Sequence, residues 1–161
     1  MAIAYDLQMA TAAPVGECAR ELCDVARSAG LLDASVTAGH LIGEGAVTGA
    51  GTWMRVGEER PPPWGCPVTE DLGFAPTVYA LFRLGKSSDP SLQQDDMIRL
   101  ASGLLTRIPG DAVLHFQYEV IWLLRRRGEL SLNARDDLWR PHRLAAVAPP
   151  YRRATYAFAE E

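Results

Sequence analysis

The sequence has little positive charge to offer a nucleic acid. Its 161 residues include 16 Lys and Arg against 20 Asp and Glu, and Lys86 is the only lysine. The charges are uneven, because residues 1–106 hold 7 basic and 13 acidic groups whereas residues 107–161 hold 9 and 7. Neither part carries the basic excess that contacts with phosphates require, so we expect no nucleic-acid partner.

Long hydrophobic runs are also missing. The longest unbroken apolar run in the second half covers only residues 120–124, whereas a helix that crosses a bilayer needs about 20 predominantly apolar residues. The first apolar stretch of the chain contains Asp6 and is preceded by no basic residue, unlike the start of a signal peptide. We therefore expect neither a membrane span nor a signal peptide, and no membrane partner.

Cysteine is scarce and its number is odd. The three cysteines are Cys18, Cys23 and Cys66. On a helix the Cα atoms of Cys18 and Cys23 would lie about 8.7 Å apart, which is beyond the reach of a disulfide. Thiols without a bridging partner are typical of a reducing compartment, so we expect a cytoplasmic protein.

Residues that carry out chemistry are scattered rather than grouped. His40, His115 and His142 have no second His or Cys at a spacing typical of metal ligands, so a structural role is expected for each. Adjacent acidic pairs such as Glu58-Glu59 point in different directions on a strand or a helix and make poor catalytic pairs. The sequence therefore predicts no catalytic residue, no metal site and no cofactor.

The sequence does contain the pattern of one α+β domain over residues 1–161. Its length and its 48% hydrophobic content are typical of a single globular domain. The clearest part is an amphipathic helix over residues 90–108, followed after a Pro-Gly break by a β-hairpin over residues 112–126. Spacings of three and four predict its buried face: Met97, Leu100, Ala101, Leu104, Leu105 and Ile108. The residues expected on its exposed face are Asp95, Asp96, Arg99, Ser102 and Arg107.

The rest of the chain adds strands and a second helix around this unit. A helix is predicted after Pro14, with Cys18 on its apolar stripe, Cys23 off it, and Gly30 ending it. Alternating runs predict strands over residues 3–9, 41–47, 52–56, 77–84 and 130–132. The predicted order is β-α-β-β-β-α-β-β-β plus a short C-terminal helix near Pro141. This describes one mostly antiparallel sheet with two amphipathic helices on one face.

Two charged motifs have ordinary structural interpretations. Residues 80–87 satisfy a relaxed phosphate-loop pattern ending in Gly-Lys-Ser. However, the residues that should curl around the phosphate are bulky strand formers, and no helix opens at Lys86, so we interpret the match as accidental. The arginine run at residues 125–127 is expected to close an exposed edge hairpin, where its charges favour solubility and block edge pairing.

The segment from Glu58 to Asp71 combines prolines, carboxylates and one tryptophan. Its prolines cannot donate the hydrogen bonds of a sheet, so an exposed excursion is expected over residues 61–67. Trp64 either folds back onto the protein or is exposed for a partner. The usual burial of large apolar side chains favours the first of these.

Short motifs along nearly the whole chain carry a family resemblance. They are Ile3-Ala4-Tyr5-Asp6-Leu7 with Ala10-Thr11, Asp71-Leu72-Gly73-Phe74 with Pro76-Thr77-Val78, Phe82-Arg83-Leu84 with Lys86 and Asp89, Pro109-Gly110-Asp111-Ala112, Leu130, Leu132-Asn133, Trp139 and Pro149-Pro150-Tyr151-Arg152-Arg153. Together they resemble the third type of immunity protein in the myxobacterial swarm-inhibition toxin (Sit) system. The chain departs from that pattern at Gly85, where an acidic residue is usual, and at Gln117-Tyr118, where an Asn-Gly turn is usual.

The resemblance implies that the protein neutralises a toxin by binding it, and it supplies no catalytic residues. We therefore expect a non-enzymatic protein whose partner is a cognate toxin. The alternative is a small-molecule-binding or enzymatic domain with a cleft between sheet and helices, which would use Lys86, His115 or Arg83. An aromatic side chain among carboxylates is typical of a protein interface. The residues expected to bind the toxin are Glu58, Glu59, Trp64, Glu70 and Asp71.

Overall fold

The computed structural model describes residues 3–60 and 62–159. Its strands are β1 (Ile3–Ala10), β2 (Ala46–Val47), β3 (Trp53–Glu58), β4 (Val78–Leu84), β5 (Asp111–Phe116), β6 (Val120–Arg126), β7 (Glu129–Leu132) and β8 (Arg152–Arg153). Its helices are α1 (Val15–Ser28), α2 (Ala38–Ile42), the π-helical turn η1 (Val68–Leu72), α3 (Pro90–Arg107) and α4 (Pro141–Leu144). None of these helices is both long enough and apolar enough to cross a bilayer.

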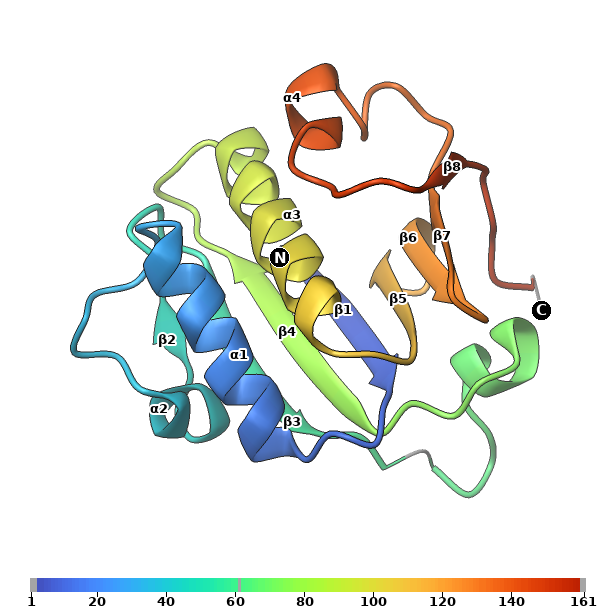
Figure 1. Cartoon of the computed structure of the whole chain (residues 1–161), viewed down its shortest axis with the longest axis horizontal. Helices are drawn as coiled ribbons and strands as arrows, with labels where there is room; N and C mark the ends of the chain where they lie inside the picture. Colours follow the sequence, from blue (N-terminus) through green and yellow to red (C-terminus); the bar gives the residue numbers. More distant parts are fainter. Residues whose placement is uncertain (1–2, 61, 160–161) are drawn as a thin grey trace.

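The strands form one sheet in the order β2-β3-β4-β1-β5-β6-β7-β8. Every neighbouring pair is antiparallel except β7 and β8, which run parallel. The two longer helices, α1 and α3, lie on the same face of the sheet, in front of the strands in Figure 1. The predicted α+β class, with two helices on one face of a mostly antiparallel sheet, is therefore confirmed.

Strand β1 occupies the middle of the sheet, between β4 and β5. Its alternating sequence points Tyr5, Leu7 and Met9 toward the helices, and all three are buried. Asp6 points to the other face of the sheet. Its neighbours in the ladder are Leu81 of β4 and His115 of β5. Both faces of the first strand are thus used, one for an apolar core and one for polar groups.

Helix α3 begins at a conventional cap and buries the predicted stripe. The Asp89 carboxylate accepts a hydrogen bond from the Ser91 amide at 2.9 Å, and Pro90 occupies the first helical position. The buried residues include the whole predicted set: Met97, Leu100, Ala101, Leu104, Leu105 and Ile108. The prediction that Asp96 and Ser102 are exposed was wrong, because neighbouring segments cover this side as well. Ser102 Oγ donates to Ala146 O at 3.2 Å.

Helix α1 ends as its glycine predicts. Gly30 has a φ of 72°, and the Leu31 amide reaches back to Ala26 O at 2.8 Å, so the last carbonyl groups are satisfied. Cys18 is buried as expected, but the prediction that Cys23 lies outside the core was wrong. The chain after the helix covers Cys23, whose Sγ lies 3.4 Å from Val36 O.

The strand predicted over residues 41–47 was largely wrong. Residues Ala38–Ile42 form α2, and only Ala46–Val47 pairs with β3. A local cap favours the helix, because Nδ1 of His40 accepts a hydrogen bond from the Thr37 amide at 2.9 Å. Neither η1 nor the two-residue β8 was predicted.

The arginine run at 125–127 leads into the turn of the β6–β7 hairpin, as predicted, but β8 pairs with part of β7, so this hairpin is not the edge of the sheet. The Arg125 guanidinium caps the C-terminal end of α3. It donates to the carbonyl oxygens of Leu105, Ile108 and Gly110 at 2.5, 2.6 and 2.7 Å. The expected surface role was therefore wrong for Arg125, whose charge satisfies backbone groups inside the fold.

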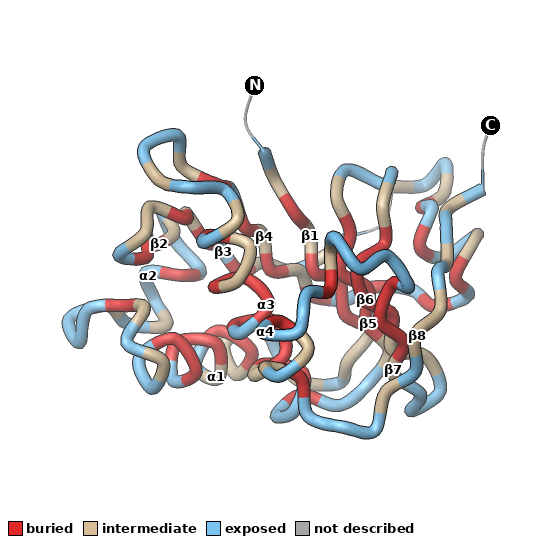
Figure 2. Tube along the Cα trace, turned by 90° about the horizontal axis from the view of Figure 1, so that it is seen from above, coloured by how far each residue is buried: buried red, intermediate tan, exposed pale blue. Residues whose placement is uncertain are grey.

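A second, smaller core lies on the sheet face that the long helices leave free. It joins sheet residues Val113, Ile121 and Leu124 to Cys66, Val68, Leu72 and Phe74 of the chain around η1. Tyr156 and Phe158 of the C-terminal segment (residues 149–159) pack against it. The green η1 region and the red C-terminal segment lie side by side in Figure 1. In Figure 2 the buried residues run along the central strands and the helices, and the exposed residues gather in the connections.

Candidate partner-binding site

The 58–71 segment leaves the end of β3 and returns to the sheet at η1. Its inward residues Cys66 and Val68 are 4% and 0% exposed, because they belong to the second core. A turn precedes them, in which the Gly65 amide donates to Pro62 O at 3.0 Å. Gly65 has a φ of 109°, a conformation that favours glycine. The outer part of the segment is therefore held on a fixed support.

Trp64 sits at the tip of this turn with 85% of its surface exposed. The prediction that it folds back onto the protein was wrong. The left-handed Gly65 reverses the chain, and Cys66 takes the inward position that the indole would otherwise fill. Pro61 lies outside the described residues. Trp64 is by a wide margin the most exposed of the large apolar side chains in the described chain.

Two of the predicted carboxylates lie at the surface with Trp64. Glu58 and Glu70 are exposed. The Glu70 carboxylate lies directly against the backbone next to Trp64, since a β-carbon on Gly65 would collide with its Oε1 atom. Glu58 pairs with Arg60 at 3.4 Å, and both side chains are largely exposed. Glu70 therefore lies beside the tip that carries Trp64, and Glu58 is exposed at the start of the same segment.

The other two predicted carboxylates are turned toward the protein. Glu59 Oε1 accepts a hydrogen bond from Gln8 Nε2 at 3.1 Å, and burial raises the pKa of Glu59. Asp71 Oδ2 accepts from the Ala159 amide at 2.9 Å, which ties η1 to the C-terminal segment. These two residues therefore hold the 58–71 segment in place, whereas Glu58, Trp64 and Glu70 are accessible to a partner.

A polar cluster lies beneath the start of the segment. His115 is fully buried, with Nε2 at 2.6 Å from Gln8 Oε1, and its Nδ1 accepts from the Tyr118 amide at 3.1 Å. These partners make Nε2 the protonated nitrogen of a neutral ring, and burial lowers the pKa of His115 to about 4. Burial, followed by the charge of Glu59, raises the pKa of Asp6 to about 6. The expected structural role of His115 agrees with these contacts.

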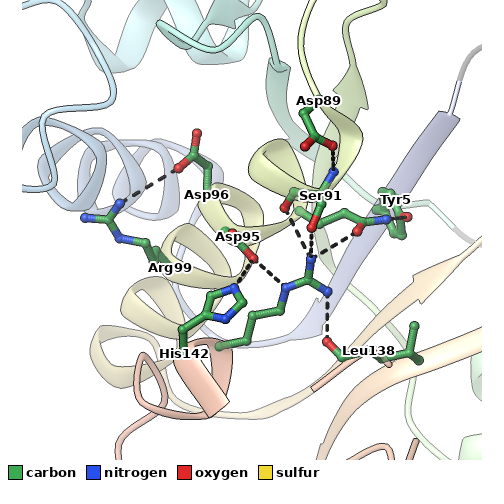
Figure 3. A network of polar contacts seen from close by, with 10 residues as sticks. Tyr5, Asp89, Ser91, Asp95, Asp96, Arg99, Leu138 and His142 are labelled. Carbon is green, nitrogen blue, oxygen red and sulfur yellow. Dashed lines mark hydrogen bonds and ion pairs between the residues drawn. The ribbon is translucent and has the colours of Figure 1, made fainter. Parts of the chain in front are cut away.

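A second polar network connects α3 to α4 and is shown in Figure 3. Its centre is Arg143, which is 2% exposed and donates to Asp95 Oδ1 at 2.5 Å and to Leu138 O at 2.9 Å. The Nη2 atom of Arg143 donates to the backbone oxygen and Oγ of Ser91 and to Oε1 of Gln94. Burial alone would raise the pKa of Asp95, but the hydrogen bonds from Arg143 and His142 outweigh it and lower the pKa. The guanidinium is thus occupied by protein acceptors, as expected of a structural anchor.

The residues of the enzymatic alternative do not converge. His115 is buried, whereas Arg83 and Lys86 are exposed, with the Arg83 guanidinium 4.8 Å from the centroid of the Trp53 ring. Four surface hollows of the described chain have volumes between 240 and 420 Å³, and none of them is lined by these three side chains. These three side chains therefore do not meet in any of the four hollows.

The phosphate-loop match is occupied by a glutamine side chain. Gln93 Oε1 accepts from the Gly85 amide at 2.8 Å, and Gln93 Nε2 donates to the carbonyl oxygens of Gly85 and Ser88 at 2.9 and 3.2 Å. The loop therefore wraps around Gln93 and not around a phosphate. Across residues 3–60 and 62–159, no three His, Cys, Asp or Glu side chains are grouped so as to hold a metal ion.

Comparison with known proteins places the chain in a family. A family model described as SitI3-like matches residues 3–143, which run from β1 to the buried Arg143 and include the 58–71 segment. No curated protein and no solved structure matches the chain significantly. The match spans most of the sheet and both long helices. The chain therefore belongs to the SitI3-like family, the Sit immunity proteins of the third type.

Proposed function

We propose that the protein confers immunity by binding a cognate toxin directly, with Trp64, Glu58 and Glu70 at the interface. Membership of an immunity family supports a toxin partner. The observation that carries the proposal is Trp64, whose side chain is 85% exposed on a segment anchored by a buried core. Exposing a tryptophan to water is unfavourable unless a partner covers it, and tryptophan is enriched among the residues that dominate binding energy.

The support beneath Trp64 favours tight binding. Cys66 and Val68 fix the base of the loop, and the Gly65 turn fixes its tip. A loop that is already ordered loses little conformational freedom when a partner binds, so more of the contact energy appears as affinity. The rigid two-torsion side chain of tryptophan adds to this effect.

The exposed carboxylates suit a partner with a basic surface. Glu58 and Glu70 precede and follow Trp64 in the sequence and are exposed, and residues 1–106 carry 13 acidic groups against 7 basic ones. Charges of this kind steer the encounter and change the association rate more than the final affinity. Because they are exposed, salt should screen their effect. A nuclease-like toxin, whose own site must attract phosphates, has the complementary charge.

A blocking role requires no catalysis by this chain, and the structure favours that interpretation. Arg143, around which several polar groups converge, is buried, and its guanidinium is engaged by protein acceptors. Arg83, Lys86 and His115 lie apart. We therefore propose a non-enzymatic protein that acts by occupying a surface of the toxin.

Calorimetry with the product of the adjacent gene tests the proposal. Trp64→Ala should weaken the complex by more than about 1 kcal/mol, or roughly fivefold in Kd. Leu92→Ala is the matched control, because Leu92 is a large apolar residue, 51% exposed, on the first turn of α3. It should bind like the wild type. Equal affinities for all three proteins would place the interface elsewhere.

The charge contribution is tested separately by stopped-flow mixing. Glu58→Lys with Glu70→Lys should slow association at low salt, and the difference should shrink as salt is added. Asp24→Lys with Glu44→Lys, at two other exposed positions, changes the net charge by the same amount and is the control for overall charge. If this control slows association as much as Glu58→Lys with Glu70→Lys, the effect belongs to net charge and not to this surface.

A further inference from the structure

The turn between β5 and β6 holds two non-glycine residues in the left-handed region. Gln117 has a φ of 50° and Tyr118 a φ of 59°, and the Glu119 amide donates to Phe116 O at 2.8 Å. This is the geometry of a type I′ turn, which favours Asn and Gly because a β-carbon crowds the backbone at positive φ. A large aromatic residue at the second position therefore works against the stability of the hairpin.

Tyr118 presents part of its ring at the surface, beside the base of the 58–71 segment. It is 40% exposed, and its ring centroid lies 4.3 Å from that of His115. Burial raises the pKa of its phenol, and a hydrogen bond with Gln8 lowers it. Gln8 in turn donates to Glu59 Oε1 at 3.1 Å, so the hydroxyl is linked through Gln8 to the start of the 58–71 segment.

The ring of Tyr118 is held from below by two other rings. The ring centroid of Phe158 lies 5.3 Å from the ring centroids of both Tyr118 and His115, and both pairs are edge-to-face. The next residue, Ala159, is fixed by the Asp71 carboxylate. The ring therefore rests on residues of the sheet and of the C-terminal segment, and it would lose little freedom against a partner.

We infer that Tyr118 is a second aromatic anchor of the toxin-binding surface, and that this surface receives Arg or Lys side chains of the toxin. The inference rests on the proposed function, because it extends the same interface. Non-glycine residues held in unfavourable backbone conformations cluster at functional sites. A partly exposed aromatic ring at such a position, next to a segment already marked by an exposed tryptophan, points to recognition.

The surrounding charges identify the kind of partner. Glu119, next to Tyr118 in the chain, is exposed, as are Glu58 and Glu70. A cationic side chain packed on the Tyr118 ring gains a cation–π contact, and the exposed carboxylates attract such a partner to this part of the surface. An acidic partner would meet like charges at each of these positions. The surface therefore fits a basic region of the toxin.

Two substitutions in the same turn separate recognition from turn geometry. Asn tolerates the left-handed conformation, so both Tyr118→Asn and Gln117→Asn should preserve the hairpin. Thermal melts establish that each variant is folded, and calorimetry with the product of the adjacent gene then measures affinity. Tyr118→Asn should weaken binding about tenfold or more, whereas Gln117→Asn should bind like the wild type. Tyr118→Phe, which keeps the ring, should stay within about threefold of the wild type.

The outcomes distinguish this inference from the proposed function. Wild-type affinity for Tyr118→Asn would overturn the inference even if Trp64→Ala weakens binding. Equal weakening by Tyr118→Asn and Gln117→Asn would also overturn it, because the effect would then belong to the backbone of the turn. Absence of binding by the wild-type protein would overturn the proposed function itself, and the second anchor with it.

Discussion

Asp6 and His115 are direct partners across the β1–β5 ladder, and burial moves the pKa values of their side chains in opposite directions. The pKa of Asp6 is raised to about 6, so the folded state holds this proton more tightly than the unfolded chain. Asp6 therefore stabilises the fold at low pH, and that stability is lost as pH rises to about 6. The pKa of His115 is lowered to about 4, so its contribution is present above pH 6.5 and is lost as pH falls.

The two contributions oppose each other between about pH 4 and 6, and single substitutions should reveal each one. In Asp6→Asn the free energy of unfolding should fall by about 3 kcal/mol from pH 6.5 to 4, at about 1.4 kcal/mol per pH unit for His115, whereas in the wild type Asp6 offsets most of this fall. In His115→Gln it should instead rise as pH falls from 6 to 4. Urea titrations across this range measure both. Parallel pH profiles for the two variants would contradict the assignment.

The buried face of α3 is tested with two leucines on the same helix. Leu104 is fully buried, so Leu104→Asp places a carboxylate in the apolar core at a cost of several kcal/mol, against a typical total stability of about 5 to 15 kcal/mol. We expect that variant to be unfolded at room temperature by circular dichroism. Leu92→Asp, at a position 51% exposed, should melt close to the wild type. A folded Leu104→Asp protein would show that this face is not the core.

The loop after β4 should depend on Gln93 and not on Lys86. Gln93 is fully buried and also accepts from Thr52 Oγ1 at 2.9 Å, so Gln93→Leu leaves several buried polar groups without partners. We expect a loss of about 1 to 3 kcal/mol in the free energy of unfolding. Lys86→Ala should leave stability unchanged. ATP binding by the wild type that disappears in Lys86→Ala would reverse our interpretation of this loop.

The network in Figure 3 predicts that substitutions of two neighbouring residues, His142 and Arg143, lower the free energy of unfolding by different amounts. Arg143→Met removes the buried partner of Asp95 and should lower the free energy of unfolding by about 3 to 5 kcal/mol. His142 contacts the same Asp95 oxygen at 2.9 Å, but its side chain is 55% exposed. His142→Ala should therefore cost less than about 1 kcal/mol. Chemical denaturation compares the two, and similar losses would show that Arg143 is not the anchor.

Local sequence patterns were sufficient to predict features that depend on the residues of a single helix. The stripe from Met97 to Ile108 and the end of the first helix at Gly30 were both predicted correctly, because spacing and capping chemistry act within a few residues. The errors arose where distant segments cover a side that looks polar. Other parts of the chain pack over Asp96, Ser102 and Cys23 and bury them. The spacing of apolar residues within one helix cannot predict such long-range contacts.

The sequence identified the residues of the candidate site but not the directions in which their side chains point. The sequence marked Trp64 and its carboxylates, yet it could not show that Glu59 turns to Gln8 or that Asp71 binds the Ala159 amide. Tyr118 was missed as a surface residue. A signal was present, since Gln117-Tyr118 occupies a hairpin turn where Asn-Gly is usual, but its meaning required the backbone angles.

The central position of β1 has a consequence for how the protein is made. This strand is synthesised first, yet both of its neighbours, β4 and β5, come much later, and Gln8 meets a histidine 107 positions further along the chain. Closing such large loops slows folding, and both edges of β1 lack a sheet partner until the ribosome has released those strands. During translation the first strand is therefore an unprotected edge, and the nascent chain should depend on chaperones until β5 emerges.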